Sequence, residues 1–211
     1  MVIAIDGPAA SGKGTLAARL AAHYGLPHLD TGLLYRAVAR ALLDARRPLA
    51  DEETAAQAAR ALDPAQLDDA RLRGRPMGDA ASIVSAHPSV RAALLDFQQG
   101  FAAQPVGAVL DGRDIGTVVC PTATVKLFIT ASPEERARRR HLELIARHEA
   151  ADFTAILDDI RRRDERDRAR SAAPLKPAPD AIILDTTALD ADAAFRTALD
   201  HVEAALRRPL S

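Results

Sequence analysis

The chain has 211 residues, enough for one substantial domain with a large core, and only 3% of them are aromatic, so that core must be aliphatic. The net charge is -1, which gives no overall field to attract nucleic acid or a membrane surface. A single cysteine, Cys120, excludes a disulfide framework and a CxxC metal site. No apolar run reaches transmembrane length, and an apolar strand follows Met1 without a signal peptide, so we expect a cytoplasmic protein.

Short apolar runs alternate with longer Ala, Leu and Arg segments that have helical spacing. Five runs are expected to form buried parallel strands: 2–6, 27–30, 107–111, 125–131 and 181–185. Seven segments are expected to form helices: 13–24, 32–45, 51–62, 79–101, 133–148, 153–171 and 190–208. This alternation predicts the α/β class with a doubly wound parallel sheet. The second strand is weak as sequence and is predicted mainly from its neighbours.

Two segments fit neither period. Residues 61–79 contain Pro and Gly and are expected to make a small excursion from the sheet, and the Pro-rich residues 171–180 should form a connector. Aspartates end four of the predicted strands: Asp6, Asp30, Asp111 and Asp185. Ligands bind at this carboxyl edge in open α/β sheets, although a turn or capping role is the better reading of the last of them.

The stretch "GPAASGKGT" lies between the first strand and the first helix and has the spacing of a phosphate-binding loop. In such loops backbone N–H groups and the helix N-terminus face the phosphates, and the lysine reaches the terminal ones. We therefore expect a nucleoside triphosphate with Mg²⁺. The residues expected to bind it are Gly7, Pro8, Ala9, Ala10, Ser11, Gly12, Lys13, Gly14 and Thr15. Gly14 stands where the usual hydroxyl residue follows the lysine, so Thr15 is the predicted Mg²⁺ ligand.

Three further motifs follow in order: "LDTGLLYR" (29–36), "DGRDIGTVV" (111–119) and "RRRDERDRAR" (161–170). Together with the loop they resemble the nucleoside monophosphate kinase group and, within it, the bacterial cytidylate kinase family. The resemblance covers nearly the whole chain. It implies phosphoryl transfer from ATP to CMP and dCMP, on a five-stranded P-loop kinase core with a small acceptor-binding insert and a helical lid. In this division of the single domain 1–211, the core is 1–60, 102–132 and 172–211, the insert 61–101 and the lid 133–171.

The resemblance also implies the acceptor-binding residues. They are Thr31, Arg36, Ser82, Arg91, Arg113, Asp114, Arg163, Asp167 and Arg170. In the family's pattern Arg36 and Arg113 meet the acceptor phosphate, and Asp114 accepts a hydrogen bond from the exocyclic amine of the base. The family more often has Ser in place of Thr31, and it usually carries a longer stretch where this chain has 61–79, which puts the size and closure of the insert in question.

Six of the ten residues in "RRRDERDRAR" are arginines. At about 100° per residue, Arg163, Arg166, Asp167 and Arg170 share one stripe, which we expect to bind substrate. Arg161 and Arg168 lie on the opposite side and should face water. A solvated helix face remains the alternative for the whole run.

The predicted chemistry depends on positive charge. An acceptor phosphate already carries its nucleophilic oxygen, so transfer requires alignment and charge neutralisation rather than a base. We expect Lys13, Arg113 and Arg163 to be catalytic. One or more of Arg136, Arg138, Arg139 and Arg140 should fold over the triphosphate, and the sequence does not choose among them. Two alternatives stay open: a UMP or AMP kinase, and a nucleotide-dependent switch. We expect a monomer that binds neither nucleic acid nor membrane.

Overall fold

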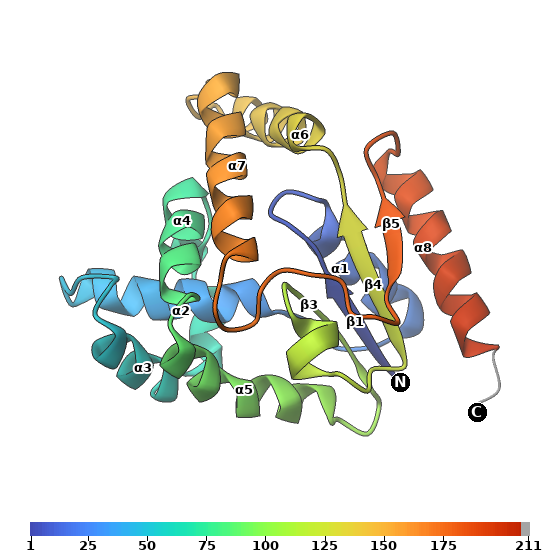
Figure 1. Cartoon of the computed structure of the whole chain (residues 1–211), viewed down its shortest axis with the longest axis horizontal. Helices are drawn as coiled ribbons and strands as arrows, with labels where there is room; N and C mark the ends of the chain where they lie inside the picture. Colours follow the sequence, from blue (N-terminus) through green and yellow to red (C-terminus); the bar gives the residue numbers. More distant parts are fainter. Residues whose placement is uncertain (208–211) are drawn as a thin grey trace.

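A computed structural model of the chain describes residues 1–207 and contains a five-stranded, all-parallel sheet, which confirms the predicted α/β class (Figure 1). The strands are β1 (Val2–Asp6), β2 (His28–Asp30), β3 (Ala108–Gly112), β4 (Val125–Thr130) and β5 (Ile182–Asp185). Their order in the sheet is β2-β3-β1-β4-β5. From β1 the chain first adds β2 and β3 on one side and then β4 and β5 on the other, so the strand order changes side at β1. The loop after β1 therefore lies at the carboxyl edge of the sheet, at the point where ligands bind in such folds.

Helices and short turns connect the strands. The α-helices are α1 (Lys13–Tyr24), α2 (Thr31–Asp44), α3 (Glu52–Arg60), α4 (Arg75–Val84), α5 (Pro88–Ala102), α6 (Pro133–Ala146), α7 (Phe153–Arg168) and α8 (Ala191–Leu206). Two 3₁₀-helices, Pro64–Asp68 and Ala70–Leu72, and one π-helical turn, Ile115–Val119, complete the elements. Within residues 1–207 no helix combines the length and the apolar character that a membrane span needs.

The prediction of one helix over 79–101 is wrong. The chain turns between α4 and α5, and His87 has an extended backbone directly before Pro88, the first residue of α5. A proline lacks an N–H for the helical ladder and disfavours helical geometry in the residue before it. It can therefore begin a helix but not continue one. The last predicted helix, 190–208, corresponds to α8, and residue 208 lies outside the described range.

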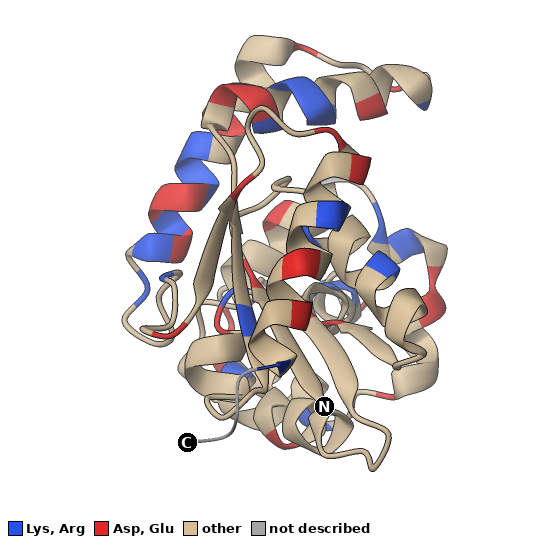
Figure 2. Cartoon of the chain, turned by 90° about the vertical axis from the view of Figure 1, so that its right-hand side faces the viewer, with Lys and Arg blue, Asp and Glu red and all other residues tan. Residues whose placement is uncertain are grey.

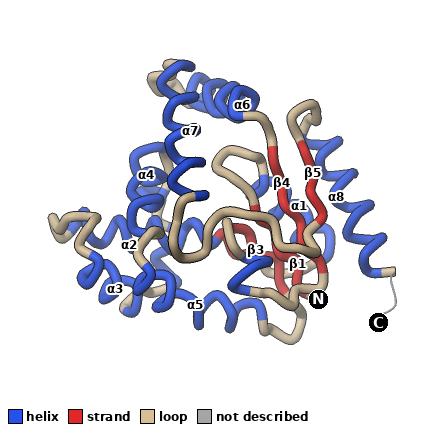
Figure 3. Tube along the Cα trace, in the orientation of Figure 1, coloured by secondary structure: helices blue, strands red, loops and turns tan. Residues whose placement is uncertain are grey.

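The sheet is buried on both faces because successive residues of a strand point in opposite directions. Ile3 and Ile5 pack with α1 and α8, whereas Ala4 packs with the cluster formed by α2 to α5 on the other face. All three side chains are inaccessible to solvent. Figure 3 shows the strands in the middle of the molecule between these helices. The two aliphatic layers hold the carboxyl edge of the sheet in place.

Asp6 at the end of β1 fixes the turn that follows β3. Its carboxylate is buried and accepts hydrogen bonds from the backbone N–H of Ile115 at 2.8 Å and of Gly116 at 2.7 Å. Burial raises the pKa of Asp6 to about 6, although the two backbone hydrogen bonds favour the charged form. The structural contact explains why an aspartate ends this strand, and it sets the position of Arg113 and Asp114 just before the turn.

Helices α6 and α7 pack together above the sheet edge, with basic and acidic residues interspersed along both (Figure 2). Their main polar link is a buried ion pair, in which Arg136 donates to Asp164 through Nη1 at 3.0 Å and Nη2 at 2.5 Å. The same guanidinium donates to the carbonyls of Ala131 at 2.9 Å and Ala9 at 3.1 Å. Arg136 therefore joins both helices to the loop that follows β1.

We expect the Asp164→Ala substitution to destabilise the fold strongly, because it leaves the charge of Arg136 buried without its partner. Loss of one member of such a pair costs about 3–5 kcal/mol in the free energy of unfolding. Arg161→Ala is the control: it removes an ion pair with Glu134 in which both side chains are more than half exposed, and should cost less than about 1 kcal/mol. Urea unfolding of both variants measures the difference. Equal costs would contradict a structural role for the buried pair.

Candidate functional site

The loop from Gly7 to Lys13 has the backbone that phosphate binding requires. A Cβ on Gly7 would lie 2.1 Å from the carbonyl oxygen of Ile129, so no other residue fits there. Gly12 has a left-handed backbone with φ 85° and precedes α1, whose start has no side-chain cap. A left-handed residue followed by uncapped helical N–H groups makes a concave surface that favours anions.

One cavity of about 550 Å³ opens on this loop. The loop lines it from Ala10 to Thr15, and the opposite wall comes from α6 and from residues 186–194 after β5. Arg139 joins the two parts of this opposite wall, since it donates to the carbonyls of Thr186 at 2.5 Å and Leu189 at 3.3 Å. This cavity has the size and the phosphate loop expected of a nucleoside triphosphate site.

The structure divides the four α6 arginines that the sequence left unassigned. Arg136 is buried in the ion pair with Asp164, whereas Arg138, Arg139 and Arg140 line the 550 Å³ cavity. Arg138 is 60% exposed and pairs with Glu135, and Arg140 is less exposed and pairs with Glu143 at 2.6 Å. Arg139 and Arg140 are thus the less exposed of the three arginines that line this cavity.

A second cavity, of about 180 Å³, lies at the carboxyl ends of the strands, directly beside Lys13. The residues that line it include all nine predicted for the acceptor: Thr31, Arg36, Ser82, Arg91, Arg113, Asp114, Arg163, Asp167 and Arg170. They come from five separate segments of the chain, and the fold brings them to one place. We call this space the acceptor cavity.

The cations of the acceptor cavity perturb one another. Burial lowers the pKa of Lys13 to about 8, with a further contribution from Arg113. Burial likewise lowers the pKa of Arg163 to about 10, and both Arg113 and Arg36 add to that shift. Buried cations that repel one another gain most when an anion enters between them. The cavity is therefore suited to a phosphorylated ligand.

Asp167 organises two of the arginines. Its carboxylate accepts from Nε of Arg113 at 3.0 Å and pairs with Arg170, which also donates to Oγ of Ser85 at 2.9 Å. Burial by itself would raise the pKa of Asp167, but Arg113, Arg170 and Arg163 together hold it below its usual value. The carboxylate is thus charged and keeps the guanidinium groups in fixed directions.

Of the predicted stripe, Arg163, Asp167 and Arg170 line the acceptor cavity, whereas Arg166 is exposed. Helix α7 ends at Arg168 and not at residue 171 as predicted, so Arg170 lies just beyond it. The inward face is rotated toward the side that carries Ile160 and Asp164, both buried. Packing against α6 sets this rotation, and spacing within α7 alone contains no information about it. Arg161 and Arg168 are exposed, as predicted.

The side of the acceptor cavity near α5 is lined by polar side chains. Arg91 pairs with the buried Asp114, and its guanidinium lies 5.5 Å from the ring centre of Tyr35. Oγ of Ser82 is buried and has no hydrogen-bond partner. An unpaired buried hydroxyl is costly unless a ligand completes it. This arrangement can recognise the edge of a small planar base.

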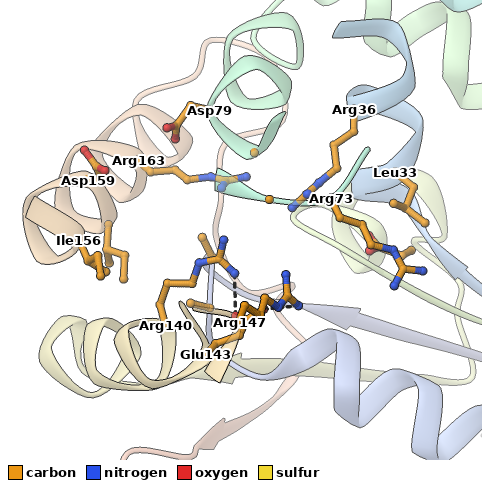
Figure 4. Close-up of a pocket in the computed structure, with 16 residues that line it drawn as sticks. Leu33, Arg36, Arg73, Asp79, Arg140, Glu143, Arg147, Ile156, Asp159 and Arg163 are labelled. Atoms are coloured by element: carbon orange, nitrogen blue, oxygen red, sulfur yellow. Dashed lines mark hydrogen bonds and ion pairs between the residues drawn. The ribbon is translucent and has the colours of Figure 1, made fainter. Parts of the chain in front are cut away.

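A third cavity, of about 380 Å³, adjoins the acceptor cavity and lies between α2, α4, α6 and α7. Figure 4 shows Arg36 and Arg163 pointing toward one another across it, with Arg140 below and Asp79 on α4. Arg36 is braced from behind, since its Nη1 donates to the carbonyl of Leu72 at 2.8 Å. Both helices predicted as the lid, α6 and α7, line this space.

Oxygen ligands suited to Mg²⁺ lie on both sides of Lys13. Thr15 is in the first turn of α1, and the carboxylates of Asp30 and Asp111 both act on the charge of Lys13. Burial and the neighbouring Asp111 raise the pKa of Asp30, so a cation here would relieve their repulsion. In residues 1–207 no three His, Cys, Asp or Glu side chains form a metal-binding group by themselves. The donor set fits Mg²⁺ held jointly with a bound nucleotide.

Sequence reasoning missed some residues at this edge. His28 holds Asp111 through a hydrogen bond of 2.8 Å from Nε2, and the histidines showed no ligand spacing that could have pointed to it.

Other residues at this edge that the sequence singled out form hydrogen bonds with the backbone. Asp30 accepts from the N–H of Gly32 at 2.9 Å and so caps α2. Asp185 accepts from the N–H of Thr187 at 2.8 Å, in agreement with the turn role that we favoured. Thr31 donates to the carbonyl of Asp111 at 2.8 Å.

The sequence matches the family described as Cytidylate kinase over residues 3–204. This chain belongs to the cytidylate kinase family. It is 72% identical to a cytidylate kinase of Methylobacterium sp. (strain 4-46) over 204 residues, which are 97% of each chain. A cytidylate kinase of Rhodopseudomonas palustris (strain TIE-1) is 65% identical over 97% of this chain and 96% of its own.

Among solved structures, an uncharacterized protein from Eubacterium ventriosum covers 97% of this chain and 99% of its own, with a TM-score of 0.55 and 15% identity. That likeness concerns the fold alone. Cytidylate kinase membership supports ATP-dependent phosphorylation of CMP and makes the chain a nucleoside monophosphate kinase.

Proposed function

We propose that this chain transfers the terminal phosphoryl group of ATP to CMP and to dCMP, with one cavity for each nucleotide. The observation that carries the proposal is the position of Lys13, which lines both the 550 Å³ cavity and the acceptor cavity. ATP would occupy the first and the monophosphate the second. Because one chain supplies both cavities, the enzyme acts as a monomer in this proposal, and neither nucleic acid nor membrane takes part.

The residues proposed as catalytic neutralise charge. The acceptor phosphate needs no proton removed, so the barrier is the repulsion between two anions and the charge on the moving group. Lys13 meets the terminal phosphates of ATP, and Arg113 and Arg163 meet the group in transit and the acceptor phosphate. Thr15, Asp30 and Asp111 would hold Mg²⁺, which when bound neutralises phosphate oxygens of the nucleotide. Asp167 keeps Arg113 oriented throughout.

The acceptor is recognised at both ends in this proposal. Arg36 and Arg163 face the phosphate, with Arg36 fixed by its hydrogen bond to Leu72. Ser82, Arg91 and Asp114 face the base, where Asp114 accepts from the exocyclic amine that cytosine has and uracil lacks. Asp167 and Arg170 would meet the ribose; Asp167 contacts Arg113, and Arg170 contacts Ser85. The cation-lined acceptor cavity disfavours a switch, which would need only water at this place.

An acceptor panel tests the proposed function. ATP consumption in the presence of Mg²⁺ should depend on CMP or dCMP and be much slower with UMP or AMP. The Lys13→Met variant should show no acceptor-dependent consumption while retaining its fold. A preference for UMP or AMP would support the other kinase reading, and ATP consumption independent of every monophosphate would support the switch.

We expect Asp114→Asn to lower the efficiency with CMP more than with UMP. The guanidinium of Arg91 can only donate, so it would keep the amide oxygen and turn the amide NH2 toward the base. The cytosine amine then loses its acceptor, and uracil does not. A polar group left unpaired costs about 1–3 kcal/mol, which is roughly five- to a hundredfold in relative kcat/KM. Steady-state kinetics with both acceptors measures the ratio. An equal fall with both would mean that Asp114 serves only to hold Arg91.

Among residues 161–170, we expect the arginines that line the acceptor cavity to contribute to activity and the exposed ones not to. Arg163→Ala and Arg170→Ala should each lower kcat/KM for CMP about ten- to a hundredfold, since each removes charge-assisted hydrogen bonds. Arg161→Ala, Arg166→Ala and Arg168→Ala should stay near the wild type because these side chains are exposed. All five are measured at saturating ATP. Small, equal effects would restore the reading of α7 as a solvated helix.

A further inference from the structure

Gly78 occupies a place in α4 where a glycine has no backbone reason to be. It lies inside the helix, its N–H is bonded to the carbonyl of Gly74 at 3.2 Å, and it does not have a positive φ. Glycine is the least favourable residue in a helix after proline, and alanine is the most favourable. Something other than local conformation accounts for the missing side chain.

The space beside Gly78 is taken by two guanidinium groups. A Cβ at this position would lie 3.1 Å from Nη1 of Arg163 and 3.7 Å from Nη2 of Arg36. Gly78 also lines the 380 Å³ cavity, across which these two side chains point toward one another (Figure 4). The two cations thus converge over the backbone of α4, at a point where a methyl group would separate them.

We propose that Gly78 is a positioning residue for the acceptor phosphate, and that its lack of a side chain lets Arg36 and Arg163 grip the same dianion. This inference rests on the proposed function, in which these two arginines face that phosphate. Gly78 contacts no substrate in this account. It acts only through the place that it leaves for the guanidinium groups.

Arg163 is the group that a methyl at Gly78 would move. Arg36 is held from behind by the carbonyl of Leu72, whereas Nε of Arg163 is buried without a hydrogen-bond partner. The end of an arginine shifts at little cost to the fold, but the shift removes it from the position shared with Arg36. Burial lowers the pKa of Arg163, and the neighbouring Arg113 and Arg36 add to that shift. Such a cluster binds a doubly charged phosphate better than any single cation does.

A simple packing role for Gly78 predicts a different result. If the glycine only allows α4 and α7 to approach, its replacement should disturb the fold and affect both nucleotides alike. If Gly78 affects neither helix packing nor substrate binding, Gly78→Ala should behave as any Gly→Ala change in a helix and raise the stability of the fold. The positioning role predicts a selective loss for the acceptor in a protein at least as stable.

The test compares Gly78→Ala with Gly100→Ala. Gly100 also lies inside a helix, α5, and a Cβ there would meet nothing within 4 Å. A group that aligns reacting phosphates and is misplaced by 1 Å can lower the rate about a hundredfold. The methyl of Gly78→Ala should move Arg163 by less than that, so we expect kcat/KM for CMP to fall about tenfold. The KM for ATP should stay within about twofold of the wild type and the Tm should not fall. Gly100→Ala should keep both kinetic constants and raise the Tm.

A double-mutant cycle with Arg163→Ala completes the test. If Gly78 acts through Arg163, Gly78→Ala should change kcat/KM for CMP less than about twofold when Arg163 is already absent. Full CMP efficiency in Gly78→Ala, a lower Tm with equal losses for CMP and ATP, or additive losses in the cycle would each overturn the positioning role. Wild-type efficiency in Arg163→Ala alone would instead refute the role of Arg163 in the proposed function, and the inference about Gly78 would fall with it.

Discussion

Repulsion among cations at the carboxyl edge of the sheet is the constraint on which the rest of this structure depends. The acceptor cavity is lined by six basic and four acidic side chains. Two unit charges 4 Å apart repel by about 4 kcal/mol at the effective dielectric of a protein surface. The fold must hold these groups together without a ligand. Burial lowers the pKa of Lys13 and that of Arg163, and the repulsion from Arg113 adds to both shifts. The same repulsion becomes attraction when anionic nucleotides enter.

Buried aspartates offset the repulsion among the cations of the acceptor cavity. Asp167 neutralises part of the charge of Arg113 and Arg170, and Asp114 that of Arg91. Two other contacts act indirectly, by fixing the backbone near the cations. They are the hydrogen bonds of Asp6 and the ion pair between Arg136 and Asp164. These contacts link segments more than a hundred residues apart in the case of Asp6. The site is thus held by polar contacts that cross the whole chain.

The short segment after α3 contributes more than its length suggests. The segment forms two 3₁₀-helices, and Leu72 at the end of the second is buried, with its carbonyl accepting from Arg36. The segment then leads directly into α4, where Gly78 faces the same guanidinium group. The segment therefore supports an arginine that lines the acceptor cavity. Its division from the core and the lid stays a prediction.

The sequence by itself determined features that depend on near neighbours in the chain. Four of the five strands follow from short apolar runs, and the loop before α1 follows from the spacing of Gly7, Gly12 and Lys13. The resemblance to the family then identified nine residues that all line the acceptor cavity. Their convergence was predictable because ligand positions in parallel sheets gather at one edge, whatever the details of the helices.

Only the tertiary structure decided which side of each helix faces the site. Arg136 and Arg139 both lie in the Arg-rich start of α6, yet Arg136 is buried against Asp164 and Arg139 lines the 550 Å³ cavity. Arg166 faces water because α6 sets the rotation of α7, and His28 meets Asp111 only because β2 pairs with β3. The spacing within a helix fixes which residues share a face, but the direction of that face depends on the element that packs against it.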